Sequence, residues 1–336
     1  MPKIEKLKSG SYRVRIYDNT QKKQLSFTHK DKQTLKRIVA DYESGKNRVE
    51  SKTLTVAEAV ENYINSKSNI LSPSTIRGYY IIYNNALNEI KNLKVADITE
   101  IVLQKWVNSN AKNYSAKSIR NQYGLITATL KQNGLHLNYD TVLLKPKQKK
   151  QMLVPNTEQI KKIIEIVKDT NIEIPIMIAV LLGLRRSEIC ALKWSDYDGE
   201  RLYIHAAVVP DKNNQHIRKE TNKSYAGTRV LDVPDVIKIL LDKHKGKGNI
   251  VNMLPSSLLR EFSKICERND LPKFTLHSLR HANASFMLLQ GIPDKYAMER
   301  LGQSTNNMLK TVYQHTFTDE QRKISDMLNR QYSDMF

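Results

Sequence analysis

Two arginines follow directly on an apolar segment near the middle of the sequence. Residues 174–182 are all apolar, and the segment GLRRSE (183–188) comes next. Arginines at a helix end are common on protein surfaces. A guanidinium that is held by a buried helix, however, can offer paired N–H donors to a phosphate in a fixed orientation. Arg185 and Arg186 are therefore candidates for binding an anion.

A second group of reactive residue types lies nearer the C-terminus. In TLHSLRH (275–281), His277 and Arg280 are three residues apart, which would place both on one face of a helix and let them bind one anion. A core histidine beside a surface arginine explains such a pair equally well. LGQS (301–304) and Tyr313 follow, although a lone tyrosine among 16 more often serves packing.

The order of these segments resembles that of the tyrosine recombinases, or phage-type integrases. GLRRSE comes first, then a basic segment that ends in TRVLDVP, then HSLRH, LGQS and a tyrosine 33 residues after Arg280. The resemblance covers the whole chain. It implies that a tyrosine hydroxyl cleaves DNA to give a 3′-phosphotyrosyl linkage, and that the freed 5′-hydroxyl later attacks a partner strand.

The resemblance assigns roles to four of these residues. Tyr313 matches the nucleophile, Arg185 and Arg280 match the arginines that hold the two non-bridging oxygens, and His277 would bind the same phosphate or carry the tyrosine proton. A tyrosine with a pKa of about 10 needs such cations and a proton acceptor around it to attack at neutral pH. Preorganised donors of this kind contribute ~2.7–4 kcal/mol each. The phosphotyrosine conserves the bond energy, so neither nucleotide nor metal is implied.

The family also has a lysine on a β-hairpin that protonates the leaving oxygen. NKSYAGTR (222–229) matches this hairpin best, with Lys223 as the general acid and Ala226-Gly227 near the turn. Lys219 is the alternative, and either lysine could simply be a solvated surface residue.

Other positions near the motifs have supporting roles or depart from the family pattern. Gln303 stands where the family most often has histidine or tryptophan; glutamine can donate a hydrogen bond to a phosphate oxygen or to the tyrosine but cannot carry a proton. Glu188 matches an acidic residue that would hold the first arginine. His281 and His315 are expected either to support catalytic neighbours or to face solvent.

The elements around these residues predict a multidomain, mainly α fold. Residues 1–52 contain strands at 11–17 and 23–28 and a helix at 30–42, and resemble an arm-type DNA-binding domain of small β-plus-helix form. Residues 53–148 predict an all-α domain, whose helices include 74–90, 99–109 and 116–132, and resemble the family's core-binding (SAM-like) domain. A lysine-rich linker spans 145–150. Residues 153–336 predict a mixed α+β domain, with short strands at 202–205 and 229–233, and resemble the family's catalytic domain.

Composition favours a polyanionic partner. The 336 residues carry a net charge of +20 and the pI is about 9.7, with the excess densest before residue 150. The longest apolar stretch, 174–184, falls short of the ~18 residues of a membrane span, and the N-terminus lacks an apolar signal region. Two cysteines exclude a disulfide scaffold and a cysteine-based zinc site. We expect a cytoplasmic, DNA-associated bacterial protein that does not act at a membrane.

Together these features predict a site-specific recombinase that integrates or excises a mobile element of a phage or conjugative transposon. The family implies a homotetramer on double-stranded DNA with core and arm sites, and possible help from an excisionase and a host DNA-bending protein. In 319–336, an apolar stripe at helical spacing predicts either a packed terminal helix or one that docks on a neighbouring protomer. A type IB-like topoisomerase and a catalytically inactive DNA-binding regulator of the same fold are the alternatives.

Overall fold

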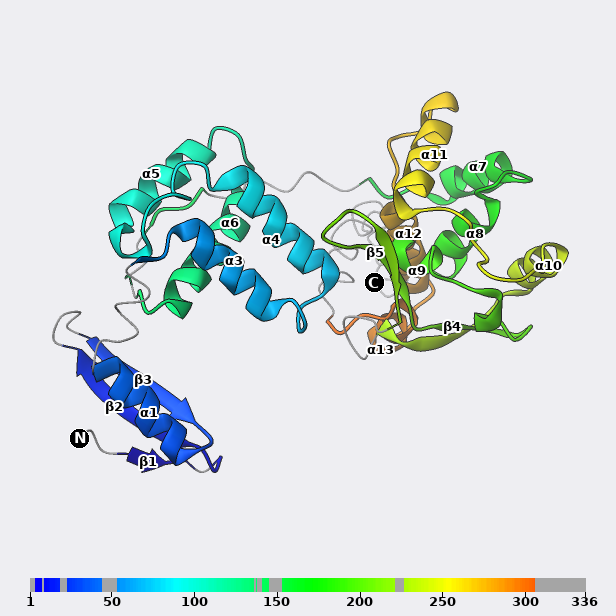
Figure 1. Cartoon of the computed structure of the whole chain (residues 1–336). Coiled ribbons are helices and arrows are strands. Elements are labelled where there is room, and N and C mark those ends of the chain that lie inside the picture. Colours follow the sequence, from blue (N-terminus) through cyan, green and yellow to red (C-terminus); the bar gives the residue numbers. More distant parts are fainter. Residues whose placement is uncertain are drawn as a thin grey trace, which may run out of the picture. The chain divides into compact units, whose positions relative to one another are not determined.

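A computed structural model describes residues 4–7, 9–18, 23–43, 53–135, 137, 141–144, 153–220 and 227–305 (Figure 1). The chain divides into two compact units, 1–149 and 150–336, and we describe each by itself. Lys223, Tyr313, His315 and the predicted helix at 319–336 lie outside the described residues. The described part is mainly helical with a small N-terminal sheet, which confirms the predicted fold class.

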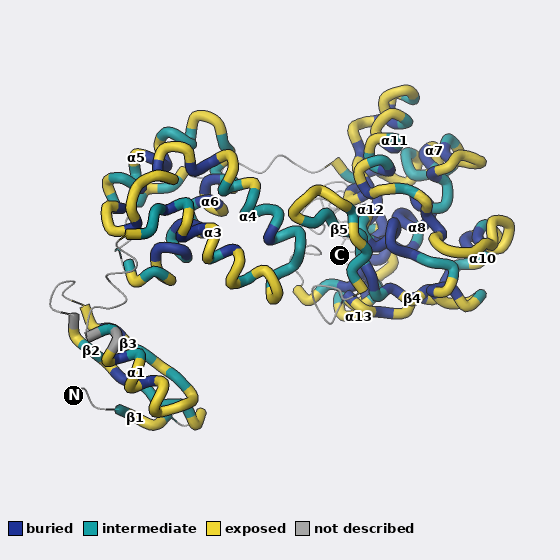
Figure 2. Tube along the Cα trace, viewed as in Figure 1, coloured by how far each residue is buried: buried dark blue, intermediate teal, exposed yellow. Residues whose placement is uncertain are grey.

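The N-terminal residues form a three-stranded antiparallel sheet with one helix on it. Strands β1 (Ile4–Lys6), β2 (Tyr12–Asp18) and β3 (Lys23–His29) pair in that order, and helix α1 (Lys32–Glu43) packs on the sheet. Val14, Leu35 and Val39 form the small core. Figure 2 shows few buried positions here, as expected where so short a segment folds around so few apolar side chains.

Four helices follow, as the sequence predicts. They are α3 (Val56–Lys67), α4 (Pro73–Ala86), α5 (Glu100–Asn110) and α6 (Ala116–Gln132), with a short 3₁₀ turn η1 (Val95–Asp97). A serine or threonine caps the N-terminus of each of these α-helices. The second helix ends at Ala86 rather than at Ile90 because the Ala86 carbonyl accepts from Trp106 Nε1 at 2.7 Å, and the next turn tightens.

The second unit is built around the apolar helix α8 (Glu173–Leu181). Residues 175–180 of this helix are buried, and it packs against α7 (Thr157–Val167), α10 (Asp235–Lys243) and α12 (Leu276–Leu289). The other helical elements are α9 (Arg186–Ile189), η2 (Trp194–Asp196), α11 (Pro255–Arg268) and α13 (Asp294–Leu301). A helix buried on all sides is a rigid support for whatever its C-terminal end presents.

Four short strands form two separate antiparallel pairs in this unit. β4 (Arg201–Ile204) pairs with β7 (Arg229–Asp232), and β5 (Ala207–Pro210) pairs with β6 (His216–Lys219). The hairpin predicted around Lys223, with its turn near 226–227, stays a prediction because residues 221–226 lie outside the described part of the chain. The described hairpin of this unit, β5–β6, lies upstream and has its turn at 211–215. That turn forms because Asp211 Oδ1 accepts from the backbone N–H groups of Asn213 and Gln215, both at 2.8 Å.

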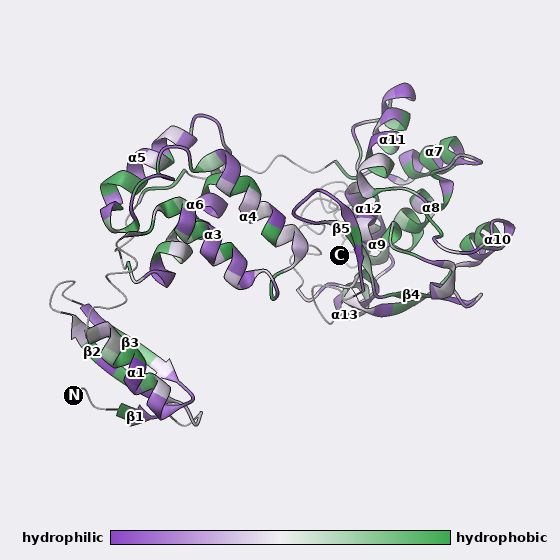
Figure 3. Ribbon diagram, viewed as in Figure 1, coloured by the Kyte–Doolittle hydropathy of each residue, from purple (hydrophilic) through white to green (hydrophobic). Residues whose placement is uncertain are grey.

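Apolar residues are concentrated inside the two units. Figure 3 shows green, apolar positions and purple, polar positions interspersed along the helices of both units, and the buried positions of α8 are all apolar. Among the described helices, none combines the length and the apolar character needed to cross a membrane.

Candidate active site

A glycine turn places Arg185 at the end of the buried helix α8. Gly183 adopts φ +64°, and a Cβ added there would lie 2.6 Å from Leu301 Cδ2 and 2.7 Å from Asn283 Oδ1. Both the backbone conformation and the tight packing therefore require glycine. The turn leads directly into α9, with Arg185 as the residue before its first turn.

The Arg185 guanidinium is held from two sides and remains partly exposed. Nη1 donates to Glu188 Oε1 at 2.6 Å, and Nη2 donates to the Gly302 carbonyl at 2.7 Å. The backbone N–H of Arg185 also donates to Glu188 Oε2 at 2.9 Å. The side chain is 40% exposed, so it is oriented by the protein yet accessible to an anion from solvent. Glu188 thus holds the first arginine, as the sequence predicts.

Arg280 is placed beside Arg185 by the long helix α12. The residue is only 1% exposed. Its Nη1 donates to the Gly183 carbonyl and its Nη2 to the Leu301 carbonyl, both at 2.6 Å. Its Nε is buried and has no hydrogen-bond partner among the described residues. The family resemblance implies that Arg280 and Arg185 act in one place, and this geometry agrees with it.

A third arginine that the sequence analysis did not single out completes the group. The Arg229 side chain, 5% exposed, pairs with Glu188: Nη2 lies 3.0 Å from Oε2 and Nη1 lies 3.5 Å from Oε1. Arg229 Nε also donates to the Arg300 carbonyl at 2.8 Å. Arg229 lies in the TRVLDVP segment of the family pattern. No residue pattern within that segment indicates that Arg229 pairs with Glu188, 41 residues upstream.

The C-terminal end of α13 connects all three arginines. Its last carbonyls, those of Arg300, Leu301 and Gly302, accept from Arg229, Arg280 and Arg185 respectively. The final turn of a helix leaves carbonyls without intrahelical partners and carries partial negative charge, which favours cations there. Gly302 ends the helix in the left-handed conformation, φ +62°, where glycine is favoured. We call Arg185, Glu188, Arg229 and Arg280 the arginine cluster.

Burial and mutual repulsion change the pKa values in this cluster. Burial, then the positive charge of Arg185, lowers the pKa of Arg280 to about 9, so the group remains a cation at neutral pH. Burial works against ionisation of Glu188, but the charges of Arg229 and Arg185 outweigh it and lower the pKa of the carboxyl group. The cluster therefore combines three cations with one carboxylate anion.

His277 lies within electrostatic reach of both predicted phosphate-binding arginines. Desolvation of its ring, followed by the charges of Arg280 and Arg185, lowers the pKa of His277 below the ordinary value for histidine. The residue itself is exposed, and its ring packs edge-on against His281, with centroids 4.6 Å apart. His281 is buried, so it supports the His277 ring rather than facing solvent.

Two predicted residues fall on the edges of this arrangement. Gln303 follows α13 directly, and its backbone N–H donates to the Met298 carbonyl at 2.9 Å, which places it next to the Arg185 contact at Gly302. Lys219 ends β6. The structure thus brings together Arg185, Glu188 and Arg280, with His277 within electrostatic reach and Gln303 beside them in sequence. Lys223, Tyr313 and His315 lie outside the described residues.

A second charged group lies at the base of the β5–β6 hairpin. His205 contacts Asp196 through Nε2 at 3.0 Å and Glu220 through Nδ1 at 3.3 Å. Arg218 pairs with the same two carboxylates and donates through Nε to the Ala191 carbonyl at 2.8 Å. We call Asp196, His205, Arg218 and Glu220 the hairpin cluster. It fixes the strand that ends immediately before residues 221–226.

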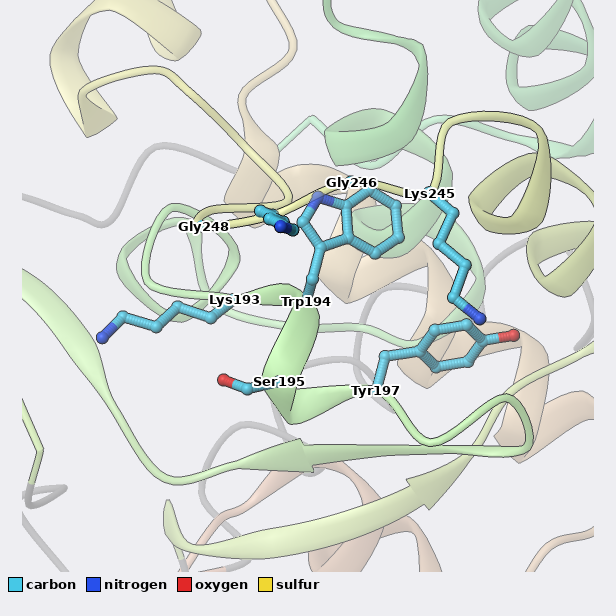
Figure 4. Close-up of a pocket in the computed structure, with 8 residues that line it drawn as sticks. Lys193, Trp194, Ser195, Tyr197, Lys245, Gly246 and Gly248 are labelled. Carbon is cyan, nitrogen blue, oxygen red and sulfur yellow. The ribbon is translucent and has the colours of Figure 1, made fainter.

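A pocket of about 380 Å³ lies elsewhere in the same unit. Its lining comes from η2 and the segment after α10: Lys193, Trp194, Ser195, Tyr197 and residues 245–248 (Figure 4). None of the predicted site residues that the structure describes lines it. Because it holds neither a proton acceptor beside a nucleophile nor any member of the arginine cluster, the arginine cluster is the better candidate for chemistry.

Comparison with known protein families agrees with this geometry. The model of the phage integrase family matches residues 154–320, which include all members of the arginine cluster. The model of the phage integrase N-terminal SAM-like domain matches residues 55–110, within the four-helix segment. The chain belongs to the phage integrase family of tyrosine recombinases. As a member of that family, it is a site-specific DNA recombinase.

Curated relatives of this recombinase come from bacteria, archaea and phage. A tyrosine recombinase XerC-like protein of Caldanaerobacter subterraneus is 23% identical over 310 residues, covering 76% of this chain and 78% of the relative. Tyrosine recombinase XerA of Pyrococcus furiosus is 27% identical over 247 residues, covering 70% and 81%. The integrase of Staphylococcus phage L54a is 24% identical over 298 residues, covering 74% and 84%.

Solved integrases share the fold of the recombinase. The Tn1549 transposon integrase in complex with transposon right end DNA has a TM-score of 0.66 at 17% identity, and the match covers 82% of this chain and all of that one. A lambda integrase dimer bound to a core site has a TM-score of 0.60 at 19% identity, with 93% and 94% covered. These structural likenesses support the fold. The roles of the site residues rest on the geometry of this chain's own side chains.

Proposed function

We propose that this recombinase integrates or excises a mobile element by cleaving and rejoining double-stranded DNA through a 3′-phosphotyrosyl intermediate at Tyr313. One observation carries the proposal: Arg280 and Arg185 are anchored at the end of α13, on the carbonyls of Leu301 and Gly302, which lie twelve and eleven residues before Tyr313. The groups suited to bind a phosphate are thus fixed at the start of the segment that carries the proposed nucleophile.

In the proposed reaction, Tyr313 Oη attacks the scissile phosphorus and forms the phosphotyrosyl bond. The bond from phosphorus to the 5′ oxygen breaks, and Lys223 supplies the proton that makes this oxygen a hydroxyl. The Tyr313 proton passes to His277, whose lowered pKa leaves the ring neutral and able to accept a proton at neutral pH. Rejoining reverses these steps, with a 5′-hydroxyl from the partner strand as the attacking group.

The two arginines would stabilise the charge that develops during attack. Arg185 is 40% exposed and so accessible to a phosphate, and Arg280 contributes a buried cation close enough to interact with it electrostatically. Because both guanidinium groups are already oriented by backbone carbonyls, little reorganisation is needed when the phosphorane forms. Gln303 would hydrogen-bond a phosphate oxygen or the tyrosine and so position the reactants. Lys219, at the end of β6, is the alternative proton donor.

The proposal extends to the assembly on DNA. Residues 1–52 would bind arm sites, residues 53–148 core sites, and residues 153–336 would carry out the chemistry in a homotetramer. A lambda integrase structure that shares this fold is a tetramer bound to a Holliday junction, and the net charge of +20 suits a DNA partner. An excisionase and a host DNA-bending protein would determine whether the element is integrated or excised. The segment at 319–336 would dock on a neighbouring protomer of the tetramer. The reaction would take place in the bacterial cytoplasm.

A nicked suicide substrate tests this proposal. The purified protein is incubated without metal or nucleotide on DNA with a nick next to a candidate attachment-site core, and covalent adducts are resolved on denaturing gels. We expect one adduct at one phosphate with the wild type and with the control Tyr296→Phe, whose tyrosine is exposed on α13, and none with Tyr313→Phe.

Other outcomes would redirect the assignment. Adducts at many unrelated sequences, with relaxation of supercoiled DNA, would favour a type IB-like topoisomerase. Tight binding to a verified site without any adduct would favour an inactive regulator, and restoration of activity by Gln303→His would then identify the defect.

A further inference from the structure

Arg229 cannot act by touching the DNA. Its side chain is 5% exposed, and each of its donor nitrogens is used inside the protein: Nε donates to the Arg300 carbonyl, Nη1 to the Gly227 carbonyl at 3.1 Å, and Nη2 to Glu188. Any effect of this arginine on cleavage must pass through the groups that it holds, which are the Glu188 carboxylate, the end of α13 and the Gly227 carbonyl.

Glu188 is shared between Arg229 and Arg185. Oε2 accepts from Arg229 Nη2 and from the Arg185 backbone N–H, while Oε1 lies 2.6 Å from Arg185 Nη1 and 3.5 Å from Arg229 Nη1. Without Arg229, nothing would compete for the carboxylate. Arg185 could then form a paired, fork-like contact with Glu188 and turn its donors inward, away from an approaching anion.

The net positive charge of the arginine cluster also depends on Arg229. Three guanidinium cations and one carboxylate leave two positive charges, both supplied to a site of low exposure. Attack of a tyrosinate on a phosphodiester monoanion gives a phosphorane with two negative charges, which this excess would balance. Loss of Arg229 would halve the excess while leaving both phosphate-binding arginines in the sequence.

We propose that Arg229 is a positioning residue for cleavage, which engages Glu188 so that Arg185 stays directed toward the scissile phosphate and the site stays cationic. The inference rests on the proposed role of Arg185 at that phosphate. It predicts that Arg229→Gln behaves like a weakened Arg185 variant rather than like a general loss of structure. Loss of a residue that orients a phosphate-binding group is expected to cost about 10- to 100-fold in cleavage rate, by analogy with outer-shell partners of metal sites.

A charge-neutral substrate separates these possibilities. In a methylphosphonate, a methyl group replaces one non-bridging oxygen of the scissile phosphate, so the ground state is neutral and one positive charge fewer is needed. The two diastereomers differ in which oxygen is removed, and therefore in which arginine loses its partner. We would measure single-turnover strand cleavage of phosphate and of each methylphosphonate diastereomer with wild type, Arg229→Gln, Arg229→Lys and Arg185→Ala.

The expected result is a shared pattern for Arg229→Gln and Arg185→Ala. Both should lose cleavage on phosphate and regain most of the loss on the same single diastereomer, and Arg229→Lys should be intermediate because it keeps the charge without the fork. For each variant, the cleavage rates on methylphosphonate and on phosphate are measured with one protein preparation. Their ratio therefore does not change if part of the sample is misfolded. Arg218→Gln is the matched control, since Arg218 is also a poorly exposed arginine, 16% exposed, whose hydrogen bonds and ion pairs among the described residues go to Asp196, Glu220 and the Ala191 carbonyl instead of to α13. It should show no regain.

The outcomes distinguish this inference from the function on which it rests. If Arg185→Ala regains cleavage and Arg229→Gln does not, Arg229 is only structural and the inference is wrong. If Arg185→Ala itself shows no regain on either diastereomer, the proposed role of Arg185 at the scissile phosphate is wrong, and the inference about Arg229 falls with it. A regain shared by Arg218→Gln would also overturn the inference, because the effect would then follow from any lost buried arginine.

Discussion

The arginine cluster and the hairpin cluster hold the same kinds of side chains in different ways. In the arginine cluster, the acceptors are backbone carbonyls of a helix end, the Gly183 carbonyl and one carboxylate that is 3% exposed. In the hairpin cluster, the acceptors include Glu220, which is 60% exposed, and the groups that contact its carboxylate include His205, which is 37% exposed. Solvent reaches His205 and Glu220 of the hairpin cluster, whereas in the arginine cluster Glu188, Arg229 and Arg280 are almost fully buried and only Arg185 is partly exposed.

This difference matches what each cluster has to do in the proposed reaction. Groups that stabilise charge gain most when they are fixed in a poorly hydrated site, because their dipoles and charges need no reorganisation. The hairpin cluster instead supports the strand that leads toward Lys223, a proposed proton donor. Ion pairs in partly solvated positions are weaker, with typical contributions of ~0–1 kcal/mol. Substitutions should therefore cost more in the arginine cluster than in the hairpin cluster.

Arg280→Lys should give the largest effect. An ammonium group cannot bridge the Gly183 and Leu301 carbonyls as the guanidinium does, so the charge would move and one carbonyl would lose its partner. We expect suicide-substrate cleavage to fall about 10²- to 10³-fold, the usual cost of losing one oriented donor. Arg218→Lys in the hairpin cluster should lose far less, and equal losses would remove the distinction between the clusters.

Glu188→Gln should destabilise the protein strongly and change its response to acid. It leaves buried Arg229 without a counter-charge, at an expected cost of about 3–5 kcal/mol at neutral pH. Because the folded state lowers the pKa of Glu188, ionisation of this carboxyl stabilises the fold above the unfolded-state pKa of about 4.3, and that stabilisation is lost as pH falls through the lower folded value.

The difference in unfolding free energy between wild type and Glu188→Gln should therefore be constant from pH 7 to about 5 and shrink below about 4.3. Urea unfolding followed by circular dichroism at a series of pH values measures it. A difference that does not change with pH would mean that the carboxylate charge contributes nothing to the fold.

Gly183→Ala tests the packing that supports Arg185 and Arg280. The alanine would meet Leu301 and Asn283 at 2.6–2.7 Å in addition to its unfavourable φ, so the Gly183 carbonyl that holds Arg280 should shift. Gly291→Ala is the matched control, because Gly291 has φ +69° but no atom within 4 Å of the added Cβ. The control should lose about 1–2 kcal/mol from backbone strain alone.

Gly183→Ala should lose a further ~1–3 kcal/mol from overpacking, and its cleavage rate should fall while that of Gly291→Ala does not. Thermal unfolding and suicide-substrate assays on both variants make the comparison. Equal stability losses would show that the close approach of Leu301 and Asn283 is relieved at no cost.

Glu220→Gln should have the smallest effect. Glu220 contacts His205 and Arg218 from a largely exposed position, so its ion pairs are screened by salt. We expect a loss of unfolding free energy below about 1 kcal/mol, which disappears at high ionic strength. A larger loss that persists in 1 M salt would place the hairpin cluster in the same class as the arginine cluster.

Local patterns in the sequence were enough to predict much of the fold. The apolar run at 174–182 predicted α8, and the apolar periodicity of 116–132 predicted α6. The three-residue spacing of His277 and Arg280 predicted that both lie on one helix, which is α12. These features depend on neighbours along the chain, where propensity and spacing act. The pairing of β4 with β7 was not predicted, because strand pairing is a long-range choice that short, polar strands specify poorly.

The support of the site was beyond sequence reasoning for a related reason. Arg185, Arg229 and Arg280 are held by backbone carbonyls, and every residue type has a carbonyl, so no side-chain motif marks the acceptors. The left-handed residues Gly183 and Gly302 were the available local signals, since each ends a helix beside an arginine contact. Only the fold shows that these two helix ends meet.

The most direct measurement is a crystal structure of the protein on nicked core-site DNA with vanadate in place of the scissile phosphate. Vanadate adopts the five-coordinate geometry of a phosphorane. Our account predicts Tyr313 Oη as one axial ligand, nitrogen atoms of Arg185 and Arg280 about 2.7–3.1 Å from the equatorial oxygens, and Arg229 still on Glu188 without touching vanadate. A vanadate bound by other cations, with the arginine cluster closed on itself, would contradict the account.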